Sequence, residues 1–204
     1  ECSRKQKLQE KLHRVFHQYG FEDIETPTFE YFEVFSKEVG TIPSRELYKF
    51  FDREGNTLVL RPDFTPSVSR ACATYFNPEK EVVSLCYTGN TFINNSSFRG
   101  RLKETTQMGV ERMGDDSPEA DAEILAMTVE CLLATGLTEF QVSVGQVDYY
   151  KAIFAQTGMS QEEEEELREL ISQKNYFGVE ELVKNKNMDK SLARVLSQLP
   201  QMFG

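Results

Sequence analysis

Apolar residues recur at intervals of three and four near the start of the chain, which is the spacing of an amphipathic helix. They are Leu8, Leu12, Val15, Phe16 and Tyr19. Gly20 follows them as a C-terminal cap, whereas no N-cap precedes them, so we expect the N-terminus to be trimmed or incomplete. The next elements predicted are a short strand over residues 21–26, ended by Pro27, and a short helix over residues 30–39.

Paired strands are predicted in the middle of the chain. Residues 47–52 and 57–61 are apolar-rich runs joined by a turn that contains Gly and Asn, which indicates a hairpin. Two longer strands are predicted over residues 82–92 and 105–113, and the segment between them is irregular. That segment carries a basic patch formed by Arg99, Arg101 and Lys103.

Helices elsewhere are marked by the residues at their ends. The markers are Thr65 as N-cap with Pro66, Ser117 with Pro118 and a stop at Gly136, and Asp148 as N-cap with a stop near Gly158. A strand is predicted over residues 140–145. Ser160 and Glu163 form a capping box, after which short helices reach Pro200.

This order of elements predicts an α+β fold, with an antiparallel sheet flanked by helices, because strands in hairpin order alternate with helices. From Ser160 onward the sequence becomes more acidic, and the elements that it predicts are helices. We therefore expect a core domain over residues 1–159 and a helical subdomain over residues 160–204.

The charge balance limits the classes of partner. The sequence has 33 acidic and 23 basic residues, a formal net charge of −10, which argues against a general nucleic-acid-binding protein. It has no apolar run long enough to cross a bilayer and no secretory leader pattern, so we expect a cytoplasmic location and no membrane partner.

The cysteines and histidines predict no metal site. The four cysteines have neither zinc-type nor redox-type short spacing, and three of them lie in apolar stretches, which is typical of reduced, buried thiols. His13 and His17 are one helical turn apart, but no third ligand is evident near them in the sequence.

The strand over residues 105–113 places polar groups where a core strand would have apolar ones. Side chains alternate along a strand, so Gln107, Gly109 and Glu111 share one face. At ~3.4 Å per residue, Gln107 and Glu111 lie about 13 Å apart, with a glycine between them, which leaves room for a small polar ligand. The alternative is a strand whose polar face is simply solvated.

Asp63 and Thr65 add a carboxylate and a hydroxyl at a strand-to-helix turn, where they are suited to binding an ammonium group. Both residue types are also ordinary helix caps, so the position alone does not distinguish a ligand site from a cap.

The residues from 19 to 158 resemble the catalytic core of histidyl-tRNA synthetases, which have the class II synthetase fold. Residues 20–27 are similar to the motif 1 strand and its proline, residues 60–65 to an Arg-Pro-Glu-x-Thr segment with Asp63 in place of Glu, and residues 107–111 to the second strand of motif 2. The resemblance implies a dimer through the motif 1 region. It also implies a histidine site in which Asp63, Thr65 and Gln107 hold the ammonium and Glu111 accepts from the imidazole.

Two positions depart from the synthetase pattern. The family has Phe-Arg-x-Glu at the end of the first motif 2 strand, where this chain has Phe, Ile93, Asn and Asn95. The arginine that grips the α-phosphate is therefore absent. One such donor is typically worth on the order of 3–4 kcal/mol of transition-state stabilisation, so we do not expect amino-acid activation by ATP.

A histidine site without the activating arginine resembles the family of ATP phosphoribosyltransferase regulatory subunits. This resemblance implies a non-catalytic protein without a cofactor, a short-form catalytic subunit as partner and histidine as effector of the first step of histidine biosynthesis. The family continues into motif 3, so we expect the sequence to be truncated. The alternatives are a divergent histidyl-tRNA synthetase, whose basic patch would contact tRNA or nucleotide phosphates, and an assembly scaffold with a vestigial pocket.

Overall fold

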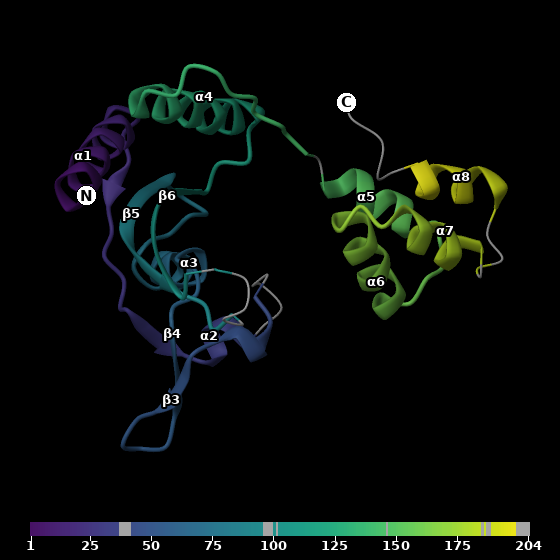
Figure 1. Ribbon diagram of the computed structural model, residues 1–204. Helices are drawn as coiled ribbons and strands as arrows, with labels where there is room; N and C mark the ends of the chain where they lie inside the picture. Colours follow the sequence, from purple (N-terminus) through teal and green to yellow (C-terminus); the bar gives the residue numbers. More distant parts are fainter. Residues whose placement is uncertain are drawn as a thin grey trace. The chain divides into compact units, whose positions relative to one another are not determined.

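The computed structural model describes residues 1–36, 42–95, 100, 102–145, 147–184, 186 and 189–198. The chain forms two compact units, Glu1–Gln141 and Val142–Gly204 (Figure 1). The first unit contains both sheets, and the second is helical. None of the helices in these described ranges is long and apolar enough to cross a membrane.

Sheet A consists of three strands in the order β1-β5-β6. They are β1 (Glu22–Asp23), β5 (Val83–Phe92) and β6 (Glu104–Met113). The long strands β5 and β6 are antiparallel, as the sequence predicts, and β1 lies parallel to β5 on the other side. The register places Tyr87 opposite Gly109 and Gly89 opposite Gln107. Directly opposed residues project from the same face, so this register determines which side chains can meet.

Sheet B contains the predicted hairpin and one further strand, in the order β2-β4-β3. Its strands are β2 (Phe29–Tyr31), β3 (Lys49–Phe51) and β4 (Thr57–Leu60), all antiparallel to their neighbours. The turn between β3 and β4 is held by the Asp52 carboxylate, which accepts hydrogen bonds from the backbone and side-chain nitrogens of Asn56, both at 2.8 Å.

The helix predicted over residues 30–39 is wrong in its first part. Residues 29–31 pair with β4, and the helix that follows, α2 (Glu33–Ser36), is short, while residues 37–39 lie outside the described part of the chain. The reason is that exposed and buried residues alternate here, as in a strand: Glu30 is buried between exposed Phe29 and Tyr31. The Glu30 carboxylate forms an ion pair with Arg70 at 2.7 Å, so a polar residue occupies the inward position of the strand. A short 3-10 helix, η1 (Ser44–Glu46), then leads toward β3.

Helices cover both faces of sheet A (Figure 1). The longer helices in the described part of the first unit are α1 (Cys2–Gln18), α3 (Thr65–Tyr75) and α4 (Pro118–Thr135). Helices α1 and α4 cover the face on which Cys86 is buried, together with Val15, Phe16 and Met127. Helix α3 covers part of the other face, where Val68 and Cys72 pack with Val83 and Leu85. Burial of these side chains fixes the position of the α3 N-terminus beside the middle of β5 and β6.

The helix ends agree with the sequence at α4 and differ at α3. Ser117 caps α4 by accepting from the backbone N–H of Ala120, and Gly136 ends the helix in the left-handed conformation. Thr65, however, is not the N-cap of α3 but its first residue, because Phe64 occupies the cap position. The Thr65 hydroxyl is therefore directed to another group.

Within its described residues, the second unit has four helices, α5 (Val147–Phe154), α6 (Gln161–Ser172), α7 (Tyr176–Lys184) and α8 (Lys190–Gln198). The Ser160–Glu163 capping box is present at the start of α6. The expected domain boundary between residues 159 and 160 falls inside this unit, because Phe154 and Met159 pack in the same core as Leu167.

Two predictions next to α5 are wrong. Residues 140–145 do not form a strand, because no strand in the described ranges pairs with them, and Val144 is 73% exposed. Asp148 is not a cap but lies in the first turn of α5, where it forms an ion pair with Lys151, and the helix ends at Phe154 rather than near Gly158.

Candidate functional site

The predicted site residues on α3 and β6 are joined by hydrogen bonds. The Thr65 hydroxyl donates to Oε1 of Glu111 at 2.6 Å. The Tyr87 hydroxyl donates to the same oxygen at 3.4 Å and accepts from Nε2 of Gln107, also at 3.4 Å. Three of the four predicted histidine-binding residues therefore belong to one cluster, and a tyrosine that sequence reasoning missed connects them.

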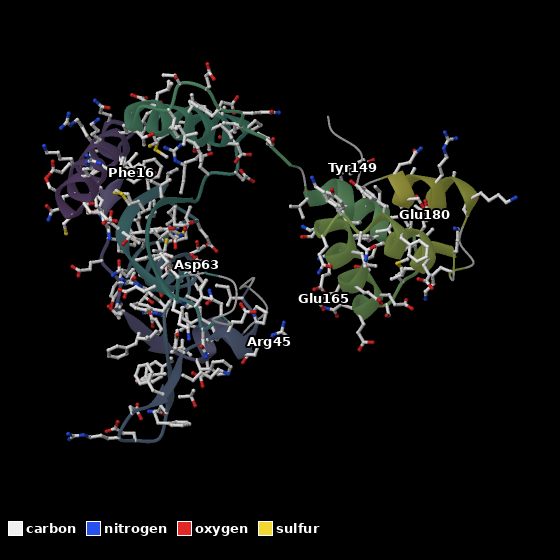
Figure 2. All side chains as sticks on the ribbon, viewed as in Figure 1. Phe16, Arg45, Asp63, Tyr149, Glu165 and Glu180 are labelled. Atoms are coloured by element: carbon white, nitrogen blue, oxygen red, sulfur yellow. The ribbon has the colours of Figure 1, made fainter. Side chains whose placement is uncertain are left out.

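Asp63, labelled in Figure 2, lies at the turn into α3. Its Oδ1 accepts from the backbone N–H of Phe64 at 2.6 Å and is 3.4 Å from the backbone nitrogen of Thr65. Asp63 thus fixes the first turn of α3, which places the Thr65 hydroxyl on Glu111. Its negative charge also acts on Glu111 and Tyr87.

The space above Gly109 is not open, which corrects the prediction of a ligand-sized gap between Gln107 and Glu111. A methyl group at Gly109 would meet the ring and hydroxyl of Tyr87, its partner across the strand pair. The lack of a side chain at Gly109 therefore makes room for the Tyr87 ring. Register was the missing information: once β5 and β6 are aligned, Tyr87 is opposite Gly109 and its hydroxyl reaches both polar ends of the face.

Tyr87 is held in place as one member of a stack of three side chains, with Phe64 and Arg61. The Phe64 and Tyr87 rings are stacked, with their centroids 4.4 Å apart and an angle of 11° between their planes. The Arg61 guanidinium lies over Phe64, 4.1 Å from its ring centroid. Tyr87 is only 4% exposed. Its hydroxyl position is therefore set by packing as well as by its hydrogen bonds.

Arg61 is engaged by backbone carbonyl groups. Its Nε donates to the Asn90 carbonyl at 2.8 Å, and its Nη1 donates to the carbonyls of Thr26 at 2.8 Å and Pro27 at 3.2 Å. Burial lowers the pKa of the Arg61 guanidinium. A buried guanidinium bonded in this way ties the segment before β2 to β5. It does not replace the phosphate-binding arginine of the synthetase motif.

The cluster is negatively charged and partly buried. Burial raises the pKa of Glu111, and the nearby Asp63 carboxylate adds to the rise, whereas hydrogen bonds from Thr65 and Tyr87 oppose it. Burial also raises the pKa of Tyr87, reinforced by the charges of Glu111 and Asp63, so its hydroxyl remains a neutral donor. Two carboxylates around a tyrosine favour a ligand that brings a cation or N–H donors rather than a phosphate.

The positions that depart from the synthetase pattern follow the end of β5. The Ile93 backbone N–H donates to the Lys103 carbonyl at 3.0 Å, and the Asn95 side chain donates to the Leu102 carbonyl at 3.3 Å. Neither side chain brings a charge to this place. Of the predicted basic patch, Lys103 is within the described chain, and Arg99 and Arg101 lie outside the described residues.

A family profile described as histidyl-tRNA synthetase matches residues 1–204. The chain belongs to the histidyl-tRNA synthetase family. Within this family, its curated relatives carry a more specific name. A protein of Acetivibrio thermocellus named ATP phosphoribosyltransferase regulatory subunit is 41% identical over 204 residues, which is 100% of this chain and 49% of that protein. A protein of Ruminiclostridium cellulolyticum with the same name is 39% identical over 204 residues, again 100% of this chain and 49% of the relative.

A solved structure agrees with this family assignment. A Bacillus halodurans protein described as an ATP phosphoribosyltransferase regulatory subunit/histidyl-tRNA synthetase is 32% identical and matches with a TM-score of 0.85, covering 96% of this chain and 50% of that one. The predicted α+β class II synthetase-like fold and the predicted resemblance to the regulatory subunits are thus confirmed. The chain spans about half the length of the curated relatives it matches.

Proposed function

We propose that this chain belongs to a non-catalytic regulatory subunit of ATP phosphoribosyltransferase and binds histidine at the Thr65–Glu111 cluster. The catalytic partner is a short-form phosphoribosyltransferase subunit, which requires the regulatory subunit for activity. Histidine bound here favours the inhibited state of the assembly and so controls the first step of histidine biosynthesis. The names of the relatives and the chemistry of the site support this proposal.

The polar groups of the cluster match the functional groups of histidine. Glu111 accepts an imidazole N–H, since its described contacts use Oε1 and leave Oε2 for the ligand. Gln107, Thr65 and Asp63 receive the ammonium group. The Tyr87 hydroxyl contacts both Gln107 and Glu111 and fills the space above Gly109, so the ligand lies over this hydroxyl rather than in that space.

The observation that carries the proposal is that the polar cluster is present while an apolar residue stands where the synthetase motif has its arginine. Gln107 and Glu111 are present, while Ile93 and Asn95 replace the charged pair of the synthetase motif. Loss of a charge-stabilising donor typically costs on the order of 3–4 kcal/mol in the transition state. Arg61 does not compensate, because two of its nitrogens are bonded to backbone carbonyls. The site therefore favours binding of an amino acid without its activation.

Titration calorimetry on the full-length protein tests the ligand. Histidine should bind, whereas lysine and arginine should not. Glu111→Ala should weaken histidine binding by roughly 1–3 kcal/mol, because the imidazole donor loses its acceptor. The matched control is Glu104→Ala on the same strand, which removes an exposed carboxylate bonded to Asn90 on the opposite face. Equal affinities of the two variants would remove Glu111 from the site.

Two activity measurements test the role. Histidine-dependent pyrophosphate exchange should be absent, and measurable turnover would establish the alternative, a divergent histidyl-tRNA synthetase. Co-expression with a short-form catalytic subunit should give a complex whose phosphoribosyltransferase activity falls when histidine is added. A complex without any response to histidine would instead support the scaffold with a vestigial pocket.

We further propose that the subunit forms a homodimer through the motif 1 region. Sheet B follows this region directly and exposes several aromatic side chains. Phe29 is 52% exposed and Tyr31 is 53% exposed on β2. Phe50 of β3 is 37% exposed on the same face of the sheet, with its ring centroid 5.9 Å from that of Phe29. Neighbouring exposed aromatic residues of this kind are typical of protein interfaces.

A further inference from the structure

Four side chains with metal-binding atoms meet where α1 crosses β1 and β5. They are His13 and His17 of α1, Asp23 of β1 and Cys86 of β5. Nδ1 of His13 is 3.3 Å from Oδ1 of Asp23, and Nε2 of His17 is 2.9 Å from Oδ2 of Asp23. The Cys86 thiol donates to Oδ1 of Asp23 at 3.4 Å. The expectation that the two histidines lack a third ligand is therefore wrong, because the fold supplies two.

The spacing of these atoms is close to that of a tetrahedral zinc site. Zinc–ligand bonds of about 2.0–2.3 Å place neighbouring ligand atoms roughly 3.3–3.6 Å apart. The four ligand atoms here all lie within 4.8 Å of one another. Small side-chain rotations would be enough to place all four around one ion.

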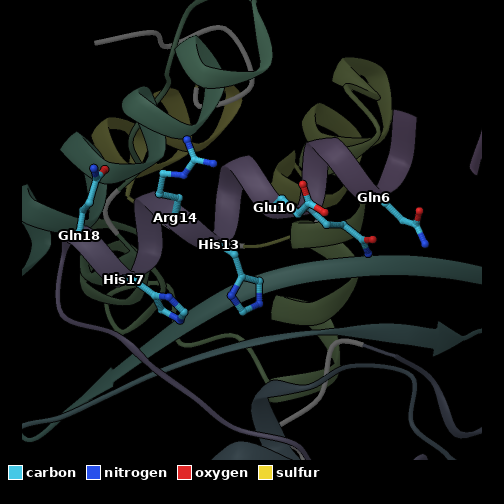
Figure 3. A pocket seen from close by; sticks show the side chains of 7 residues that line it. Gln6, Glu10, His13, Arg14, His17 and Gln18 are labelled. Carbon is cyan, nitrogen blue, oxygen red and sulfur yellow. The ribbon is translucent and has the colours of Figure 1, made fainter. Parts of the chain in front are cut away.

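The surroundings of the cluster are those of a structural site. Cys86 is fully buried, among Val15, Phe16 and Met127, so its sulfur is held in a fixed position. The two histidines project from the same side of α1 and line a shallow pocket on the surface of the helix (Figure 3). The side chains of His17 and Asp23 are also partly exposed, so an ion can reach these ligands from solvent, while Cys86 anchors the set in the core.

We propose that His13, His17, Asp23 and Cys86 bind one Zn²⁺ ion, which links α1 to β1 and β5. Both imidazoles bind in their neutral form, Asp23 binds as a carboxylate, and the Cys86 thiol loses its proton to water and binds as a thiolate. The two negative ligands balance the two positive charges of the ion. A set of two nitrogens, one oxygen and one sulfur suits zinc, which accepts all three kinds of ligand.

This site is separate from the proposed histidine site. Cys86 and Tyr87 are consecutive residues of β5, so their side chains project from opposite faces of sheet A. The zinc proposal does not depend on the regulatory function, and failure of either one leaves the other intact.

The test uses the whole chain, freed of metal and titrated with Zn²⁺ against a chelating dye, and with Co²⁺ as a spectroscopic probe. One zinc per chain and a cobalt–thiolate charge-transfer band are expected. The sequence has two histidines, so proton NMR should show both imidazole ring signals shifting together with zinc.

Three variants remove ligands: His17→Gln, Asp23→Asn and Cys86→Ala. Each should weaken zinc binding by more than the roughly 10- to 100-fold typical of losing an outer-shell partner. The matched control is Cys131→Ala, which removes a partly buried thiol of the same core cluster. A second control, Cys2→Ser, removes the exposed thiol.

The cobalt–thiolate band should be absent from Cys86→Ala and present in both controls. The proposal is overturned by the absence of stoichiometric binding, or by equal zinc affinity in wild type and Asp23→Asn. If Cys86→Ala fails to fold, the His17→Gln and Asp23→Asn variants still decide, because both residues are more than a third exposed.

Discussion

Gly109→Ala is the sharpest probe of the proposed histidine site, because it adds one methyl group beneath Tyr87. Placed on the present backbone, the new Cβ would lie 2.6 Å from Cζ and 2.9 Å from Cε2 of Tyr87, well inside van der Waals contact. The ring cannot move freely, since it is buried and stacked on Phe64. The substitution must therefore shift Tyr87 and the hydroxyl that connects Gln107 to Glu111.

Overpacking of this kind costs typically ~1–3 kcal/mol in the free energy of unfolding. Denaturant unfolding followed by circular dichroism measures this cost, and calorimetry measures histidine affinity. We expect Gly109→Ala to lower both stability and affinity. Gly145→Ala is the matched control, because a Cβ at Gly145 meets no atom within 4 Å.

A double-mutant cycle identifies the neighbour responsible. In a Tyr87→Ala background the added methyl group has space, so Gly109→Ala should cost much less there than in the wild type. An equal cost in both backgrounds would show that the methyl group does not act through Tyr87. That result would refute the account of why a glycine occupies this position.

Three further predictions concern charge, capping and assembly. Burial raises the pKa of Glu111 above its ordinary value of 4.5, so the folded state favours the protonated acid. Wild type should therefore lose stability relative to Glu111→Gln as pH rises through and beyond 4.5, which parallel denaturations of the two proteins measure. A stability difference that stays constant with pH would exclude this linkage. Ser117→Ala should cost about 1 kcal/mol in urea unfolding, because α4 loses the cap that accepts from Ala120, and an unchanged midpoint would contradict the cap. Phe29→Ser combined with Phe50→Ser should shift the full-length protein from dimer to monomer in sedimentation velocity, because the two rings are in contact on one face of sheet B, and a persisting dimer would exclude this face as the interface.

Strands whose partners are close in sequence could be predicted from sequence alone. The 47–61 hairpin and the long β5–β6 pair were found because their apolar runs are bounded by turn residues. The capped helices α4 and α6 were found for a similar reason, since each begins at a serine with a clear capping pattern.

Elements that depend on distant contacts could not be predicted in this way. Strand β2 was missed because its inward residue is a glutamate, which becomes reasonable only when Arg70 of α3 is in place. Residues 140–145 have the alternation of a strand but lack a strand to pair with in the described chain. At the candidate site, the residue types were predicted, whereas Tyr87 emerged only from the strand register.

The stack of Tyr87, Phe64 and Arg61 has a mechanical consequence. Its inner end touches the polar cluster, and its outer end grips the carbonyls of Thr26 and Pro27, just before β2. Because Phe64 is stacked on Tyr87 and lies under Arg61, a ligand that tilted the tyrosine ring would disturb the hydrogen bonds from Arg61 to this segment. Binding at the proposed histidine site would in this way be coupled to strand β2, whose exposed aromatic residues form the proposed dimer interface.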